Sequence, residues 1–260
     1  MILLPNKANS LKWLASFLFI FSITIHPGST QTINFRNYTV LNGLANSNIY
    51  YTLQDSRGFL WLATSSGVNR FDGKKFELLT TDNGLADNEV LMIYEDSKGR
   101  IWFLNFNGKL GYYYDGKFFN PENDETLKKA VIKSSYTNCF EDSSNRLWFA
   151  TNQQQIVEID DQKVKIYHKP NKELDISNTF IFEDEHNRVL AANNKGFYYL
   201  GEKGIVQEPA KYLPISSKSS QYNKQKRQLV YLSEKGLIEF KNGQFNIIRS
   251  IPEEIVKKEM

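Results

Sequence analysis

The stretch that decides the fold is Glu95-Asp96-Ser97-Lys98-Gly99-Arg100-Ile101-Trp102, because the chain repeats it. Nearly the same segment occurs at Gln54 to Trp61, and a third copy occurs at Glu141 to Trp148. A fourth copy, Glu183 to Leu190, has leucine in place of tryptophan, and a fifth, degenerate copy ends at Val230. The intervals between the final residues of the copies are 41, 46, 42 and 40 residues. The chain is therefore built from repeats of about 42 residues.

The repeats agree at positions outside this segment. The residues eight and one before each final residue are all apolar: Leu53, Tyr94, Phe140, Phe182 and Tyr222, then Leu60, Ile101, Leu147, Val189 and Leu229. The residue six positions after the final one is glycine in every copy but the third, where it is Gln154. Agreement in several independent columns excludes a chance resemblance between short motifs.

Each repeat predicts four short strands, which in the first copy are Asn48 to Leu53, Phe59 to Thr64, Gly67 to Phe71 and Lys75 to Leu79. A small sheet cannot bury both faces alone, so such units stack on their neighbours around a ring. The sequence therefore predicts an all-β propeller of four-stranded blades, and its aromatic content of 14% suits pleated sheets. Glu122 to Val131 is expected to be a helical insertion that lengthens the second repeat.

The expected domain is the propeller at residues 31–250, with blades at roughly 42–82, 83–130, 131–174, 175–214 and 215–250. About five repeats are present, and we expect an incomplete ring. Residues 251–260, with Ile251 to Val256, are interpreted as the start of a further blade or a truncated end. The alternative is a closed five-bladed ring, to which Ile33 to Val40 would add a strand on the last sheet.

The first thirty residues predict a signal peptide. Lys7 and Lys12 precede a mostly apolar run from Trp13 to Ile25, which is too short to span a bilayer as a helix and ends before Pro27. Export to a bacterial periplasm is therefore expected, with an uncleaved membrane anchor as the alternative. Because the segment holds two lysines and no acidic residue, its removal lowers the net charge from +3 to +1.

Composition and motifs exclude several classes of function. No stripe of lysine and arginine remains to bind nucleic acid. The single cysteine, Cys139, can form neither an internal disulfide nor a cysteine-cluster zinc site. His168 and His186 lack the spacing of zinc ligands, and no serine nucleophile elbow, P-loop or dinucleotide fingerprint occurs. We expect no catalytic residue, no metal and no cofactor.

The repeated residues are interpreted as structural. An aspartate followed three residues later by glycine or asparagine accepts backbone N–H bonds in a tight turn, and the tryptophans are expected to wedge between blades. These structural residues are Asp55, Gly58, Trp61, Asp96, Gly99, Trp102, Asp142, Trp148 and Asp184. The periodic arginines, Arg57, Arg100, Arg146 and Arg188, are interpreted as solvated turn residues and not as a sialidase-type arginine cluster.

The candidate ligand-binding residues lie where the copies diverge. If the aspartate turns occupy one face, the strand connections on the opposite face are free to carry a site. The residues there are Phe106, Asn107, Asn152, Gln153, Asn194 and Lys195, with Ser65 and Ser66 at the equivalent position of the first repeat. Phe106 is the leading candidate because an apolar ring in a turn has no obvious role in the core. Loops that drift freely remain the alternative explanation.

The chain resembles the two-component regulator propeller family. The first repeat opens with Asn42-Gly43-Leu44 and closes with Gly67-Val68-Asn69-Arg70-Phe71-Asp72-Gly73. The second opens with Asn83-Gly84-Leu85 and ends at Tyr114-Asp115-Gly116. The later repeats lose the opening triplet and then the tryptophan.

This resemblance implies a sensor and not an enzyme: the periplasmic half of a membrane histidine kinase, as in Bacteroidetes-type bacteria. Implied partners are an unidentified ligand such as a glycan fragment, the membrane kinase portion of the same receptor, and a second copy in a homodimer. The kinase half itself is absent, because no phosphoacceptor histidine or nucleotide lid is present. The alternative is a secreted propeller enzyme, such as a sialidase-like hydrolase or a lyase.

Overall fold

The computed structural model describes residues 36–169, 176, 179–193, 196–201, 204–208, 220–223, 228–233, 236–241 and 244–250. The expected signal peptide at 1–30, the expected further blade at 251–260, and the candidates Asn194 and Lys195 lie outside the described residues. All described elements belong to one compact unit, Tyr38–Met260. Within the described ranges, no helix has the length and apolar character needed to cross a membrane.

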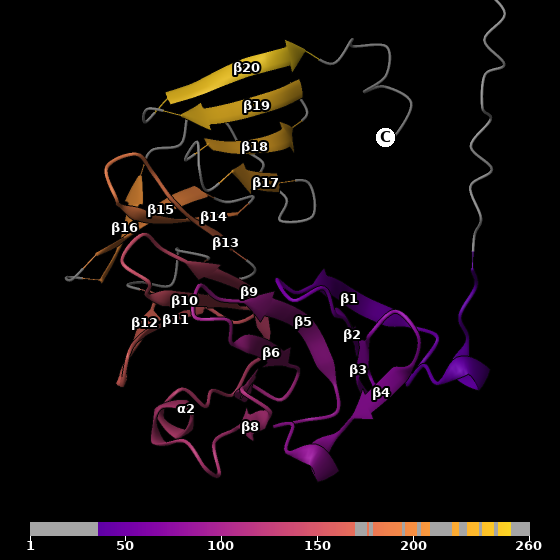
Figure 1. Cartoon of the computed structure of the whole chain (residues 1–260). Helices are drawn as coiled ribbons and strands as arrows, with labels where there is room; N and C mark the ends of the chain where they lie inside the picture. The colour runs from indigo at the N-terminus through magenta and orange to yellow at the C-terminus, as the bar shows by residue number, and fades with distance from the viewer. Residues whose placement is uncertain are drawn as a thin grey trace, which may run out of the picture. The chain divides into compact units, whose positions relative to one another are not determined.

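In the described ranges, twenty strands form five four-stranded antiparallel sheets, which can be followed in Figure 1. The first sheet contains β1 (Ile49–Gln54), β2 (Leu60–Thr64), β3 (Gly67–Phe71) and β4 (Phe76–Leu79). The second contains β5 (Val90–Glu95), β6 (Ile101–Asn105), β7 (Leu110–Tyr114) and β8 (Lys117–Phe119). The third contains β9 (Tyr136–Glu141), β10 (Leu147–Thr151), β11 (Gln155–Asp160) and β12 (Lys163–His168).

The last two sheets repeat the same order of strands. The fourth contains β13 (Phe180–Glu183), β14 (Val189–Asn193), β15 (Gly196–Gly201) and β16 (Gly204–Glu208). The fifth contains β17 (Ser220–Asn223), β18 (Gln228–Ser233), β19 (Gly236–Lys241) and β20 (Gln244–Ser250). In every sheet each strand pairs with the next one along the chain. The predicted all-β class, with about five repeats of four strands, is confirmed.

No pairing among the described strands joins the fifth sheet to the first, as expected for an incomplete ring. The alternative closure required Ile33 to Val40 to form a strand on the last sheet. In the described part of that segment, Arg36 to Thr39 form no strand, and Val40 begins the short 3-10 helix η1 (Val40–Asn42). The described residues therefore give the closure no support.

The predicted helical insertion is shorter than Glu122 to Val131. Only α2 (Glu125–Lys129) is helical, and Asp124 caps it by accepting hydrogen bonds from the N–H groups of Thr126 and Leu127. The preceding residues are held in a turn instead, because the Asn120 side chain accepts from the N–H of Glu122 at 2.8 Å. A further 3-10 turn, η2 (Thr81–Asn83), links the first two sheets.

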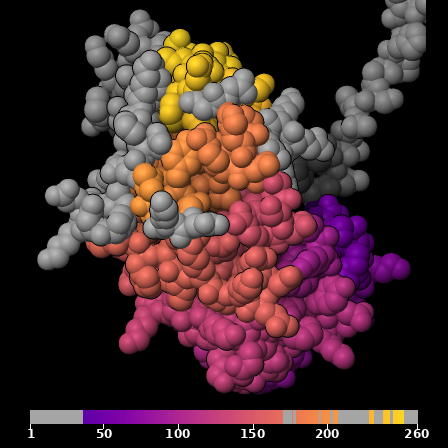
Figure 2. Space-filling view, turned by 90° about the vertical axis from the view of Figure 1, so that its left-hand side faces the viewer, coloured from indigo at the N-terminus to yellow at the C-terminus, as the bar shows by residue number. Residues whose placement is uncertain are grey.

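Apolar clusters fill the space between consecutive sheets. Trp61 packs with Val90 and Phe103 of the second sheet, Trp102 with Phe149 of the third, and Trp148 with Ile181 of the fourth. Phe182 packs with Phe240 between the fourth and fifth sheets. The edge strands β12 and β16 also contact each other, and Figure 2 shows these salmon and orange segments side by side. Each sheet thus buries its faces only by stacking on its neighbours, which is how repeat architectures are stabilised.

Candidate functional site

In the turn between the first two strands of a sheet, the aspartate has a structural role, because both of its carboxylate oxygens accept hydrogen bonds from neighbouring residues. In the second sheet, Asp96 Oδ1 accepts from the N–H groups of Lys98 and Arg100, at 3.0 and 2.9 Å. Its Oδ2 accepts from Trp102 Nε1 at 2.8 Å and from Arg100 Nε at 2.6 Å. Gly99 has a φ of +75°, which a residue without a Cβ adopts at little cost. One buried carboxylate therefore fixes the turn, the tryptophan and the arginine together.

The other copies use the same bonds. Asp55 and Asp142 each accept from two backbone N–H groups and from the indole of Trp61 or Trp148, both at 2.9 Å. In the third and fourth copies the residues with positive φ are Asn145 and Asn187, both at +61°. Asp184 accepts from the N–H groups of His186 and Arg188, but has no indole partner because position 190 is leucine.

The periodic arginines are turn residues and are partly solvated, as expected, with 21% to 46% of each side chain exposed, but the structure adds a contact that the sequence did not predict. Each forms an ion pair with the aspartate of its own turn: Arg57 with Asp55, Arg100 with Asp96, Arg146 with Asp142 and Arg188 with Asp184, at 3.3, 2.6, 2.7 and 2.6 Å. The Arg100 and Arg146 guanidinium groups also lie over the rings of Trp102 and Trp148. A charge-assisted hydrogen bond lowers the free-energy cost of removing a carboxylate from water. This explains why an arginine lies beside each buried aspartate.

A second repeated contact joins one sheet to the next. It lies on the face that carries the aspartate turns, which we call the aspartate-turn face. The last residue of the first strand in the second, third and fourth sheets is a glutamate, and it accepts hydrogen bonds from the serine after the preceding sheet's aspartate. The Oγ atoms of Ser56, Ser97 and Ser143 donate to Glu95, Glu141 and Glu183, at 2.6, 2.6 and 2.7 Å. The backbone N–H of each serine donates to the same carboxylate. The motif Glu-Asp-Ser is therefore an inter-sheet clamp combined with a turn.

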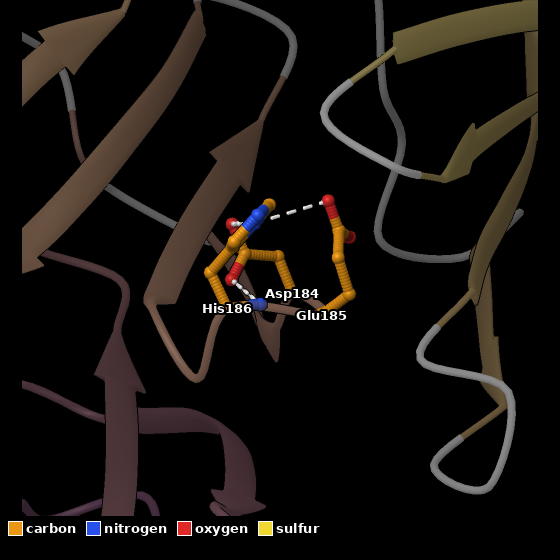
Figure 3. Close-up of side chains that lie close together, drawn as sticks. All are labelled: Asp184, Glu185 and His186. Atoms are coloured by element: carbon orange, nitrogen blue, oxygen red, sulfur yellow. Dashed lines mark hydrogen bonds and ion pairs between the residues drawn. The ribbon is translucent and has the colours of Figure 1, made fainter.

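Asp184, Glu185 and His186 are the one group in the described part of the chain whose side chains could converge on a metal ion. Figure 3 shows the Glu185 carboxylate facing the His186 imidazole, and the two approach to 3.2 Å. However, Arg188 already lies against Asp184 Oδ2, and its hydrogen bond to that carboxylate raises the pKa of the guanidinium. The positive charge of Arg188 beside the Asp184 carboxylate opposes the binding of a metal cation to the same carboxylate. The geometry therefore gives Asp184 a structural role in its turn.

The face opposite the aspartate turns carries the connections between second and third strands. Phe106, directly after β6, is 55% exposed, although it is a large apolar residue. Its neighbour Asn107 accepts from the N–H of Lys109 at 3.0 Å, which closes the turn. We call the connections at 106–108 and 152–154, with the link residues 131–135 between them, the turn face.

Ser135 brings the predicted residues of two sheets together. Its Oγ donates to the carbonyl oxygen of Phe106 at 2.8 Å, and its N–H donates to the side chain of Asn152 at 3.2 Å. The N–H of Asn152 donates in turn to the carbonyl of Ser135 at 3.1 Å. Gln153 follows, with its N–H bonded to the Thr151 hydroxyl. Ser135 therefore joins Phe106 and Asn152 in one hydrogen-bonded frame, and Asn107 and Gln153 extend it as the next residues along the chain.

Gly108 allows the link residues 131–135 to lie close to the turn at 106–108. A Cβ added at Gly108 would lie 2.1 Å from the carbonyl oxygen of Ile132, and the φ of Gly108 is +78°. The carbonyl of Gly108 accepts from the Ile132 N–H at 3.1 Å. Any other residue would push the link away from the turn.

Buried polar groups gather around this frame. The side chains of Asn105, Ser134, Thr137 and Asn138 have buried polar atoms with no hydrogen-bond partner in the structure. Asn105 is the residue before Phe106, and the other three flank Ser135. Each such atom costs about 1–3 kcal/mol unless a water or ligand bonds it. In the aspartate turns, by contrast, the carboxylates of Asp55, Asp96, Asp142 and Asp184 all accept hydrogen bonds.

Two hollows lie near these elements. One, of about 550 Å³, is bordered by the link and by β11 and β12, and contains Lys133, Gln153, Gln154, His168 and Lys169. The other, of about 840 Å³, lies beside α2. Its aromatic wall is already engaged, since Tyr112 stacks on Phe119 and donates its hydroxyl to Asp124 at 3.0 Å. Burial, followed by the charge of Asp124, raises the pKa of Tyr112 to about 12.

Reasoning from sequence missed the basic residues of the first hollow. Lys133 precedes β9, whereas His168 ends the last strand of the same sheet and Lys169 follows it, so no local motif joins them. The signal that was available was topological, because the start of the first strand and the end of the fourth lie on the same side of an antiparallel sheet.

Comparison with known proteins gives two kinds of match. The family model described as "Two component regulator propeller" matches residues 43–66 and 84–107. No curated protein matches the chain.

Among solved structures, the chain is similar to the extracellular domain of the hybrid two-component system BT3049 from B. thetaiotaomicron, with 21% identity and a TM-score of 0.63. The match covers 83% of this chain but 32% of the BT3049 domain, so this chain spans about a third of that domain's length. The extracellular domain of BT4673, from the same organism, matches with 15% identity and a TM-score of 0.58, covering 80% of this chain and 30% of that one. Virginiamycin B lyase from Staphylococcus aureus matches with 15% identity and a TM-score of 0.57, covering 75% and 67%. At these identities the likeness establishes the fold, a β-propeller.

Proposed function

Because the chain carries two repeats of the two component regulator propeller family, we propose that it is the ligand-recognition part of an exported two-component receptor, with the turn face as its binding surface. The membrane kinase portion of the receptor is the proposed partner, and a homodimer is the proposed signalling state. The proposed location is the periplasm, which agrees with the extracellular origin of the similar domains. The exposed ring of Phe106 within a frame of amides is the observation that carries the proposal.

The arrangement suits a ligand with both apolar and polar surfaces. Binding sites combine aromatic surface with a few polar groups that fix orientation. At the turn face, Phe106 provides the ring, and Asn107, Asn152 and Gln153 provide amides on exposed backbone turns. The buried polar atoms beneath them offer further donors and acceptors. An oligosaccharide fragment meets these requirements, because its rings present C–H faces and hydroxyl edges.

The test is a binding screen of oligosaccharides against the wild-type chain and Phe106→Ala. We expect affinity for the best ligand to fall by about ten-fold or more, since an aromatic contact contributes on the order of 1–3 kcal/mol. Tyr114→Ala is the matched control: Tyr114 is 46% exposed and is the last residue of β7, next to the turn to β8 on the aspartate-turn side. Equal affinity of Phe106→Ala and wild type would reject the turn face as the binding surface.

A secreted propeller lyase or hydrolase is the second candidate, and the lyase fold match is the observation that raises it. It predicts that the bound ligand is converted. Mass spectrometry of the ligand recovered after long incubation separates the two functions, because a sensor returns it unchanged.

A further inference from the structure

We propose that the hollow beside the turn face binds an acidic group of the ligand, a carboxylate or a sulfate ester, through Lys133, His168 and Lys169. This inference rests on the proposed function, since it assigns a chemical class to the ligand of the same face.

The first argument is charge. The described residues that border the hollow are Val131, Ile132, Lys133, Gln153, Gln154, Gln155, Ile166, His168 and Lys169. All charged or protonatable groups among them are basic, and no carboxylate borders the hollow within the described residues. By contrast, the hollow beside α2 mixes both signs, with Asp160 and Asp161 near Lys129 and Lys163. A cleft of one sign attracts the opposite charge and raises its local concentration.

The second argument is that these cations have no acidic partner. Elsewhere in the described ranges, Lys98 pairs with Asp161, Lys128 with Glu125, and the turn arginines with their aspartates. Neither Lys133 nor Lys169 forms an ion pair within the described residues, and Lys169 is bonded there through its backbone N–H to Gln154. Within the described residues, therefore, no ion pair occupies either side chain.

The third argument is the position of the hollow. Gln153 belongs both to the hollow and to the frame that Ser135 joins to Phe106. The hollow's volume, about 550 Å³, falls within the range of ligand pockets. Val131, which is exposed, and Ile166 give the hollow an apolar side. One extended ligand can thus place a ring against Phe106 and an acidic group among the lysines.

The experiment uses calorimetry with two matched pairs of probes: glucuronate against glucose, and N-acetylglucosamine 6-sulfate against N-acetylglucosamine. In the wild type we expect each acidic probe to bind about ten-fold tighter than its neutral partner, because a charge-assisted hydrogen bond contributes roughly that factor. The pair with the larger preference identifies the acidic group. Inorganic sulfate is included to show whether the anion alone is bound.

The variant Lys133→Gln/Lys169→Gln is expected to lose this preference while it still binds the neutral probes. The control is Lys117→Gln/Lys163→Gln, which removes two exposed lysines that begin β8 and β12 on the opposite face. It should keep the preference, and thermal unfolding should show that both variants fold.

The outcomes separate the two proposals. Equal wild-type binding of acidic and neutral probes overturns the acidic-group inference, as does a preference lost in the control variant. Neutral binding that still depends on Phe106 would nevertheless keep the proposed function. An acidic preference that survives Phe106→Ala at full affinity would place the site in the hollow and reject the turn-face ring.

Discussion

The first three sheets and the last two use the same topology but different side-chain contacts. From the first sheet to the third, each aspartate holds an indole, and each Ser–Glu clamp joins the next sheet. In the fourth repeat leucine replaces tryptophan and Glu185 replaces serine, and in the fifth repeat Asn223 stands where the clamp needs glutamate. The fourth and fifth sheets are instead joined by phenylalanines, with Phe182 and Phe240 at 5.7 Å.

Among the described residues, the first three junctions thus combine a polar clamp with apolar packing, whereas the contacts shown at the last junction are aromatic. The two substitutions at the last junction are also complementary. A glutamate at both positions 185 and 223 would place like charges together, and the chain has only one.

The largest expected effect comes from Asp96→Ala. It leaves the buried Trp102 Nε1 and two turn N–H groups without an acceptor, so we expect the free energy of unfolding to fall by about 3–5 kcal/mol. Asp184→Ala should cost less, because no indole depends on Asp184. Urea denaturation measures both. A loss at Asp184 as large as that at Asp96 would contradict the distinction between the two regions.

The clamp gives the next largest effect. Glu141→Ala removes the acceptor of the Ser97 hydroxyl and N–H, and we expect a loss of about 1–2 kcal/mol. Glu122→Ala, at an exposed glutamate, is the control. In the reverse direction, Glu185→Ser with Asn223→Glu builds a clamp at the last junction. The double variant should be more stable than the two single changes predict, by about 1 kcal/mol, and strict additivity would refute the clamp.

A comparison of probes tests whether the two regions differ in stability. In a Trp13→Phe background, all remaining tryptophans lie in the first three sheets: Trp61, Trp102 and Trp148. Tryptophan fluorescence then reports on those sheets, whereas circular dichroism reports on all strands. We expect the dichroism signal to begin to fall at lower urea concentration than the fluorescence. Coincident transitions would show one cooperative unit.

Cys139 provides a chemical probe of the same difference. Burial in β9 raises the pKa of its thiol well above the ordinary value, and nearby Asp96 and Glu141 add to this. The folded chain should therefore react very slowly with a thiol reagent at pH 8, and its labelling should follow the fluorescence transition. Rapid labelling of the native chain would contradict the packing of the second sheet against the third.

The fold was predictable because its signal is repeated. Five copies of the apolar columns specify the strands, and the glycine or asparagine three residues after each turn aspartate specifies positive φ. The pairing of Glu95 with Ser56 was not predictable from one repeat, because the partners are 39 residues apart and meet only when the sheets stack. The ion pairs of the arginines were not predicted for a related reason: the buried state of their aspartates, which makes the ion pair favourable, is a tertiary property.

The candidate site was predictable only in part. Divergence among copies indicated Phe106, Asn107, Asn152 and Gln153, and Ser135 joins two of them, Phe106 and Asn152. The basic hollow was not predicted, because its residues come from the start and the end of the chain segment that forms the third sheet. Asn194 and Lys195 lie outside the described residues.

The most direct test of the division between a structural face and a recognition face measures thermal stability and ligand affinity together in two variants. Ser97→Ala, in the aspartate-turn face, is expected to lower the unfolding temperature by a few degrees and to leave the affinity of the best oligosaccharide unchanged. Phe106→Ala is expected to leave the unfolding temperature unchanged and to weaken binding by about ten-fold. If Phe106→Ala instead destabilises the fold and retains full affinity, the assignment of the two faces is wrong.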